Sequence, residues 1–183
     1  MVLALPPGQA SALEHVEVAE GGDLVATFEY EDTTNEYGGE TESALTLAIS
    51  RAGSIVYSAP VTSEHCVESC ASAYEAPDVH VATLEPGHPP VVVLEVTTDG
   101  AHCCYISQVF SGPGTSGITM LEHEFGDPRG RLDPIGQEGS DVFVSADDRF
   151  AYAFTDYADS GLPLQIWALQ DGVFSAVTAA TRR

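Results

Sequence analysis

Four cysteines, in two pairs that each follow a histidine, are the residues of this sequence best suited to metal or redox chemistry. Sulfur and imidazole ligands bind Zn²⁺ or copper, but the spacing here matches no standard zinc module. Side chains of neighbouring strand residues point to opposite faces, so adjacent cysteines are poorly placed to share one ion. We therefore favour disulfides, and pairing within or between the stretches stays open. The two stretches are His65-Cys66-x-x-x-Cys70 and His102-Cys103-Cys104.

A second candidate site combines carboxylates with aromatic rings. Asp147 and Asp148 follow a predicted strand, and Arg149 and several rings come next. Paired carboxylates serve as acid and base in glycoside hydrolysis, although no further catalytic carboxylate is identifiable from the sequence alone. Rings beside acids also suit a sugar or peptide surface. The alternative is a salt-bridged turn with packed rings, and Phe150 and Tyr152 share a strand face that can belong to the core. The residues we expect to contact a ligand are Tyr157, Asp156, Asp159 and His102.

The charge balance limits the classes of partner. The chain has 183 residues, 28 acidic side chains, six arginines, no lysine and a formal net charge of −22. Such a surface repels phosphate backbones, so we expect no nucleic acid partner. Cations and basic surfaces are better partners, although the charge can also serve solubility alone. No apolar run approaches the roughly 20 residues that span a bilayer, so we predict no transmembrane segment.

The first twelve residues resemble the end of a secretory signal. Residues 1–12 contain a short apolar run, two prolines and the small-residue pattern Ala10-Ser11-Ala12. We interpret them as a signal-peptide remnant or leader and expect a secreted, extracellular protein. An even number of cysteines in an exported chain favours disulfides.

Alternating apolar and polar residues predict an all-β fold for residues 13–183. Hairpin turns with glycine separate strands that group into three tandem, four-stranded, antiparallel units resembling propeller blades, over about 13–61, 78–126 and 130–180. The second strands of the units begin at Leu24, Val91 and Val142. Three blades are fewer than the usual minimum of about four for closure. We therefore expect a single domain built as an open or distorted stack, with an oligomer as a further possibility.

Three stretches, which cover roughly residues 78–178, resemble bacterial exported proteins with FG-GAP or VCBS propeller-like repeats. They are Asp99-Gly-Ala-His-Cys-Cys-Tyr105, the run FVSADDRFAYAF from Phe143 to Phe154, and Leu164-Gln-Ile-Trp167 followed by Asp171-Gly172. The chain looks like actinobacterial exported proteins of this kind without an assigned function, so the resemblance concerns the fold more than the activity. It also favours pairing Cys66 with Cys70 and Cys103 with Cys104.

In repeats of this family, the loop between the first and second strands often carries aspartates that bind Ca²⁺. The matching loop of the third unit offers Asp133, Gln137 and Asp141, although Ile135 stands where the family has an aspartate. A plain turn is the alternative. We expect no other cofactor. His88 and His123 are expected to lie on the surface.

These observations predict a non-catalytic, exported binding or scaffold module whose ligand is an unknown protein or carbohydrate. The alternative is a carbohydrate-active or redox enzyme that uses Asp147 and Asp148 or the Cys103-Cys104 pair. Convergence of Asp147 and Asp148 with a third acid in one pocket would distinguish the enzyme from the binding module. Function on repeat scaffolds gathers in loops, so we expect the segments 99–104 and 150–160 to emerge at the same edge.

Overall fold

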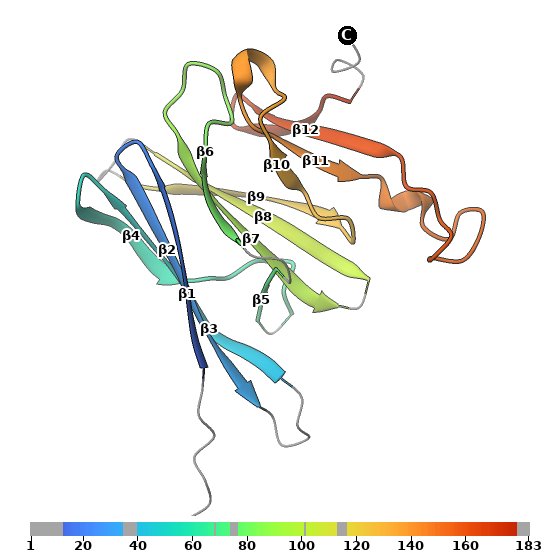
Figure 1. The fold of residues 1–183 in the computed structure, drawn as a ribbon, viewed down its shortest axis with the longest axis horizontal. Coiled ribbons are helices and arrows are strands. Elements are labelled where there is room, and N and C mark those ends of the chain that lie inside the picture. Colours follow the sequence, from blue (N-terminus) through green and yellow to red (C-terminus); the bar gives the residue numbers. More distant parts are fainter. Residues whose placement is uncertain are drawn as a thin grey trace, which may run out of the picture.

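The computed structural model describes residues 13–34, 40–67, 69–73, 77–100, 102–112 and 117–178. In these residues the chain is all-β, with strands arranged in three antiparallel sheets and two short 3₁₀ helices (Figure 1). The predicted fold class is confirmed. The predicted leader, residues 1–12, lies outside the described residues. Among the described elements, none is a helix with the length and apolar character needed to cross a membrane.

The first sheet is a meander of four long strands in the order β1-β2-β3-β4. Alternation explains it: every second residue is buried from Leu24 to Phe28 in β2 and from Leu45 to Ile49 in β3. Tight turns at Gly22 and Gly53, whose φ angles are +61° and +78°, connect the outer pairs of strands. The strands are β1 (Leu13–Gly21), β2 (Leu24–Thr34), β3 (Glu40–Arg51) and β4 (Ser54–Pro60).

The second sheet has five strands because two short ones share an edge. β6 pairs with the first half of β7 and β5 pairs with the second half, while β8 and β9 follow on the other side. The two-residue strand β5 was not predicted. The strands are β5 (Ala71–Ser72), β6 (Val79–Ala82), β7 (Val91–Gly100), β8 (Cys103–Ser111) and β9 (Thr119–Gly126).

The third sheet has shorter strands and a long connection in its middle. Its order is β10-β11-β12-β13, and residues 147–163 between β11 and β12 contain the 3₁₀ helix η2 (Asp148–Phe150). A second such helix, η1 (Gln137–Gly139), precedes β11. The strands are β10 (Arg131–Asp133), β11 (Val142–Ala146), β12 (Leu164–Gln170) and β13 (Val173–Ala176).

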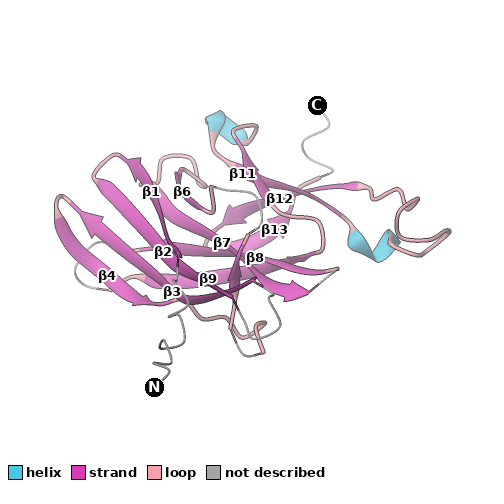
Figure 2. Ribbon diagram, turned by 60° about the horizontal axis from the view of Figure 1, so that its bottom comes forward, coloured by secondary structure: helices cyan, strands magenta, loops and turns pink. Residues whose placement is uncertain are grey.

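The second sheet lies between the other two, with one apolar core on each side (Figure 2). Val92 and Leu94 pack toward the first sheet, whereas Val93 packs with Phe143 of the third. Because both faces of β7 are covered, it reads as a nearly continuous apolar run rather than an alternating one. Leu24, Val91 and Val142 begin the second strand of each unit, β2, β7 and β11, as predicted.

A buried ion cluster lies where the first sheet meets the second and the chain passes to the third. Arg129, between β9 and β10, forms ion pairs with Glu95 of β7 and with Asp78, which is 1% exposed. The carboxylate of Glu17 on β1 accepts a hydrogen bond of 2.6 Å from the backbone N–H of Asp78. Burial, followed by the negative charge of Glu17, raises the pKa of Asp78 to about 7.

Candidate functional site

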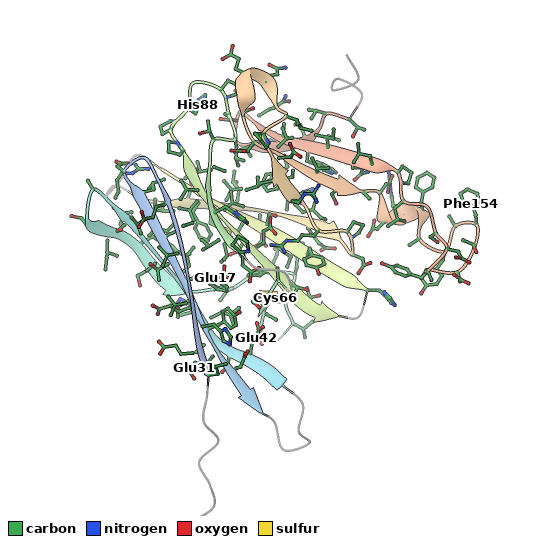
Figure 3. The ribbon with its side chains drawn as sticks, viewed as in Figure 1. Glu17, Glu31, Glu42, Cys66, His88 and Phe154 are labelled. Carbon is green, nitrogen blue, oxygen red and sulfur yellow. A yellow bond between two sulfur atoms is a disulfide. The ribbon has the colours of Figure 1, made fainter. Side chains whose placement is uncertain are left out.

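Five rings gather at one end of the second and third sheets, and we call this group the aromatic surface. One ring comes from the turn between β7 and β8 and four come from the β11–β12 connection. Tyr152 and Phe154 are 62% and 89% exposed, which is unusual for side chains of this size. Figure 3 shows Phe154 on the β11–β12 connection. The members of the aromatic surface are His102, Phe150, Tyr152, Phe154 and Tyr157.

Ring contacts join the two segments that form this surface. The rings of His102 and Tyr157 have centroids 4.2 Å apart, and those of Tyr152 and Tyr157 are 5.5 Å apart. Phe150 and Phe154 form a looser pair at 6.4 Å. The expectation that the two connections emerge at the same edge is confirmed. Tyr157 is half-buried between its two neighbours, so Phe154 is the more accessible ring.

Local hydrogen bonds, rather than a strand, shape the β11–β12 connection. Asp147 begins η2 by accepting a bond from the backbone N–H of Arg149, and the chain then turns through Tyr152, whose φ angle is +60°. The alternative interpretation, in which Phe150 and Tyr152 share a strand face of the core, is therefore wrong, and both rings are exposed. The backbone N–H of Asp159 donates to the Asp156 carboxylate at 3.1 Å, so Asp156 stabilises a turn.

An acidic cleft of about 410 Å³ opens beside the aromatic surface, between β9 and the third sheet. Asp147 and Asp148 converge there with Glu124 of β9, and the Trp167 ring of β12 forms part of the wall. A shared cleft with a third acid is the criterion by which we separated an enzyme from a binding module. However, the Arg149 guanidinium occupies both oxygens of Asp147, so Asp147 is not free to serve as the proton donor that hydrolysis needs. Glu124 was not singled out in the sequence, because only the β8–β9 pairing brings it there.

Two of the three cleft carboxylates already have cationic or imidazole partners. The Asp147 carboxylate accepts hydrogen bonds of 2.7 and 2.6 Å from the Arg149 guanidinium, which lowers its pKa. The Glu124 carboxylate lies 2.7 Å from Nδ1 of His65. The Asp148 carboxylate lies close to the backbone of Gly126, where a side chain would clash with it. Glycine, with a φ angle of +79°, leaves room for it. The cleft therefore offers acceptor oxygens next to an aromatic wall.

His123 lies inside an aromatic cage behind this cleft. Its ring is 4.3 Å from Trp167, 4.7 Å from Phe125 and 4.9 Å from Phe174 by centroid distance. The expectation of an exposed His123 is wrong, because this side chain is half-buried. Burial, with a smaller effect of His65, lowers its pKa. His88 is exposed, as expected.

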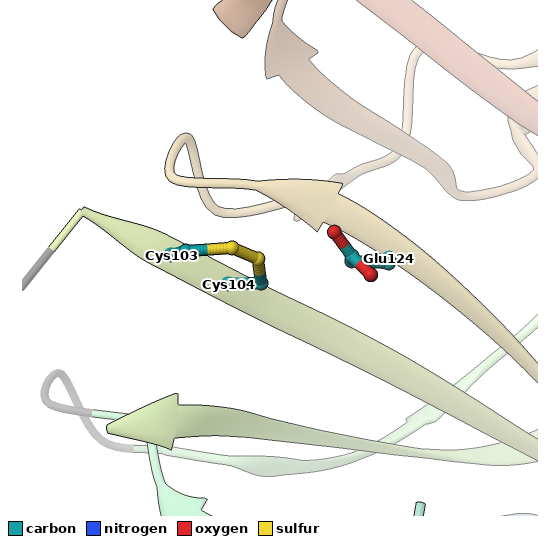
Figure 4. Close-up of side chains that lie close together, drawn as sticks. All are labelled: Cys103, Cys104 and Glu124. Carbon is teal, nitrogen blue, oxygen red and sulfur yellow. A yellow bond between two sulfur atoms is a disulfide. The ribbon is translucent and has the colours of Figure 1, made fainter. Parts of the chain in front are cut away.

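The two disulfides lie on a separate pocket of about 600 Å³. The structure pairs Cys66 with Cys70 and Cys103 with Cys104, which is the pairing that the family resemblance favours. The backbone N–H of Cys104 donates a 2.8 Å hydrogen bond to the Thr98 hydroxyl of β7. Figure 4 shows both sulfurs of the vicinal pair on the side of β8 that faces Glu124. The covalent bond holds the two sulfurs together on that side.

The predicted calcium ligands occupy the β10–β11 region. Asp133 ends β10, Gln137 begins η1, and the Asp141 carboxylate accepts a 2.9 Å hydrogen bond from the backbone N–H of Thr83. Among the described histidines, cysteines and acids, Asp133 and Asp141 belong to neither group close enough to share an ion. Calcium binding stays a prediction. The two groups are Cys103, Cys104 and Glu124, and Glu64, His65 and Glu122.

Two known proteins are similar to part of the chain. No family model matches it, and no solved structure gives a significant match. A probable thylakoid lumen protein of Synechocystis is 40% identical over 86 residues, which are 45% of this chain and 25% of that protein. An uncharacterized protein of Sinorhizobium fredii is 36% identical over 78 residues, 42% of this chain and 12% of that protein. The matches therefore span a quarter or less of the length of these relatives.

Proposed function

We propose that this chain is a non-catalytic, exported module that binds an oligosaccharide across its aromatic surface and acidic cleft. The observation that carries the proposal is the contact between His102 and Tyr157, which joins rings from two sheets into one exposed patch. The C–H faces of sugars stack on aromatic rings, and carboxylates and guanidinium groups bind sugar hydroxyls. Phe154 and Tyr152 supply the rings, while Asp148 and Arg149 supply the polar contacts.

Three features support export. A relative is described as a probable thylakoid lumen protein, and proteins reach that compartment by translocation. All four cysteines are bonded, as in proteins of oxidising compartments. The composition of residues 1–12 resembles the end of a secretory signal.

An array of neutral and amino-sugar oligosaccharides, followed by calorimetry on the best ligand, tests this function. We expect Phe154→Ala and Tyr157→Ala each to weaken binding about tenfold, which is the effect of losing one stacked ring. Ile55→Ala is the matched control, because Ile55 of β4 is an exposed apolar side chain on the first sheet. Equal affinities for the Phe154 variant, the Tyr157 variant and the parent would reject the aromatic surface. Capture of a protein and no glycan would reject the ligand class.

The convergence of Asp147, Asp148 and Glu124 favours a carbohydrate-active enzyme as the second candidate function. Hydrolysis needs one carboxyl group that donates a proton and one that stays ionised. Release of new reducing ends from the bound oligosaccharide, abolished in Asp148→Asn and retained in Ile55→Ala, would establish this alternative. Stable binding without product release would reject the enzyme and support the non-catalytic binding module.

A further inference from the structure

We propose that Cys103, Cys104 and Glu124 form a Zn²⁺ site that opens when the vicinal disulfide is reduced. The site shares Glu124 with the acidic cleft but uses none of the rings of the aromatic surface, and Zn²⁺ binding can be tested without the proposed carbohydrate ligand. It lies on the 600 Å³ pocket that the crossover from β4 to β5 covers.

The ligand atoms already lie together. One oxygen of Glu124 and the two sulfurs are all within 4.8 Å of one another. Glu124 comes from β9 and the cysteines begin β8, and the two strands pair with Ile106 opposite Glu124. The sheet ladder therefore fixes the carboxylate relative to the sulfurs, and Figure 4 shows it directed toward them.

A hydrogen bond orients the carboxylate for this role. Nδ1 of His65 lies 2.7 Å from one oxygen of Glu124, and both side chains are about one-third exposed. Partners of this kind hold a ligating carboxylate in place and support its affinity for metal. His65 is thus a positioning residue, and the carboxylate keeps a second oxygen for the ion.

Reduction is the step that creates the ligands. A dithiol reductant transfers two electrons and two protons: its own thiols form a disulfide, the bond between Cys103 and Cys104 breaks, and both become thiols. Zn²⁺ then binds, and each thiol loses its proton to solvent as it becomes a thiolate ligand. Atoms and charge balance without any other reactant.

The donor set selects zinc among common divalent ions. Two thiolates and one carboxylate suit Zn²⁺, with bonds of about 2.3 Å to sulfur and about 2.0–2.2 Å to oxygen. Tetrahedral geometry sets ligand atoms about 3.5–3.8 Å apart. The two sulfurs, which are bonded to each other in the oxidised chain, therefore separate on reduction, within the 4.8 Å limit that the group already satisfies. Water supplies the fourth ligand. The ion would crosslink the start of β8 to β9, whereas the disulfide crosslinks only two residues that are adjacent in sequence.

A neighbouring group supplies the matched control. Glu122 lies two residues before Glu124 on the same strand, so it faces the same side. It belongs to the group with Glu64 and His65, and its carboxylate also accepts hydrogen bonds from Ser63 and Gln108. Its carboxylate also lies 3.7 Å from Nε2 of His65. Substituting Glu122 therefore changes a carboxylate of the same strand and one contact of the positioning residue, but none of the proposed ligands.

The test is an anaerobic Zn²⁺ titration of the full chain against a chromophoric chelator, before and after reduction with a phosphine that is then removed. We expect one Zn²⁺ per reduced chain and at least about 100-fold weaker binding by the oxidised chain. Glu124→Gln should weaken binding by the reduced chain about tenfold or more, and Glu122→Gln, which removes no ligand, should weaken it by less than about threefold. A variant with Cys66→Ser and Cys70→Ser should retain the redox-dependent site.

Several results would overturn the proposal. They are equal Zn²⁺ affinity of the oxidised and reduced chains, binding retained after Cys103→Ser with Cys104→Ser, and a loss caused by Glu122→Gln but not by Glu124→Gln. Alkylation mapped by mass spectrometry tests the parent chain without any substitution. Zn²⁺ must protect Cys103 and Cys104 of the reduced chain and leave Cys66 and Cys70 reactive. Loss of the β-sheet circular dichroism on reduction would also reject the site, because it depends on the β8–β9 pairing.

Discussion

The first and third sheets have the same strand order but divide their residues differently between pairing and loops. The strands of the first sheet have nine, eleven, twelve and seven residues, whereas those of the third have three, five, seven and four. The residues that the third sheet leaves unpaired include the 147–163 connection, which carries most of the aromatic surface. Shortening the strands frees chain for a site while the remaining ladder holds its ends.

The largest expected effect is loss of a core ring on either side of the second sheet. Phe28 and Phe143 are both fully buried, one in the core with the first sheet and one in the core with the third. Each substitution to Ala should lower the free energy of unfolding by about 3–5 kcal/mol, measured by urea denaturation. Hydrogen exchange should sharpen the comparison: Phe143→Ala should expose the amides of β11 and β12 selectively, since that sheet has the fewest ladder bonds. Equal loss of protection throughout the chain would show that the three sheets unfold as one unit.

The next effect concerns the junction that all three sheets share. Arg129→Ala should lower the free energy of unfolding by about 3 kcal/mol, because it leaves Glu95 and Asp78 buried without their cation. Arg131 of β10 provides the control, since it is exposed, and its replacement by Ala should cost less than about 0.5 kcal/mol. If the two variants have equal stability, the ion cluster does not stabilise the junction.

The same cluster predicts a pH dependence of stability. The pKa of Asp78 rises from 3.8 to about 7 on folding, so the folded state binds more protons between these values. The free energy of unfolding should therefore fall as pH rises from about 4 to about 7, by up to about 4 kcal/mol for a shift of this size. Burial also raises the pKa of Glu95, which acts in the same direction, whereas Arg129 opposes both shifts.

Asp78→Asn should flatten this dependence and increase stability at pH 8. Asparagine keeps the shape of the side chain and carries no charge to bury beside Glu17. Thermal unfolding from pH 4 to pH 8 measures the slope. An unchanged slope in the variant would assign the effect to other carboxylates, of which Glu95 is the first candidate.

The alternation of apolar and polar residues in the sequence predicted the sheets, because alternate residues of a strand are buried. Leu24, Ala26 and Phe28 alternate with exposed or half-buried residues, and the apolar run of β7 indicates a strand covered on both faces. Strand β5 was not predictable in this way. Ala71 and Ser72 pair with β7 through their backbones and carry no pattern of their own.

The site was only partly predictable, because its parts meet through tertiary contacts. The alternation of Phe150 and Tyr152 resembled a strand, but the hydrogen bonds of Asp147 to Arg149 begin a 3₁₀ turn instead. Glu124 and His65 are distant in sequence and meet only when β9 lies beneath the chain that leaves β4. The alternating pattern around Glu122 and Glu124 indicates a strand. It does not indicate which residues these two acids contact in the folded protein.

The smallest expected effect separates two rings within the aromatic surface itself. Phe154 is 89% exposed, so Phe154→Ala should change the free energy of unfolding by less than about 0.5 kcal/mol. Tyr157 packs against His102 and Tyr152, and Tyr157→Ala should cost about 1 kcal/mol, the typical value of aromatic pairing. Tyr157→Phe keeps both ring contacts and should restore the parent stability. Because the contact with His102 joins the two sheets, its loss should also increase amide exchange at the start of β8, which Phe154→Ala should not do. Equal stability and exchange in the Phe154→Ala and Tyr157→Ala variants would mean that the two connections lie side by side without supporting each other.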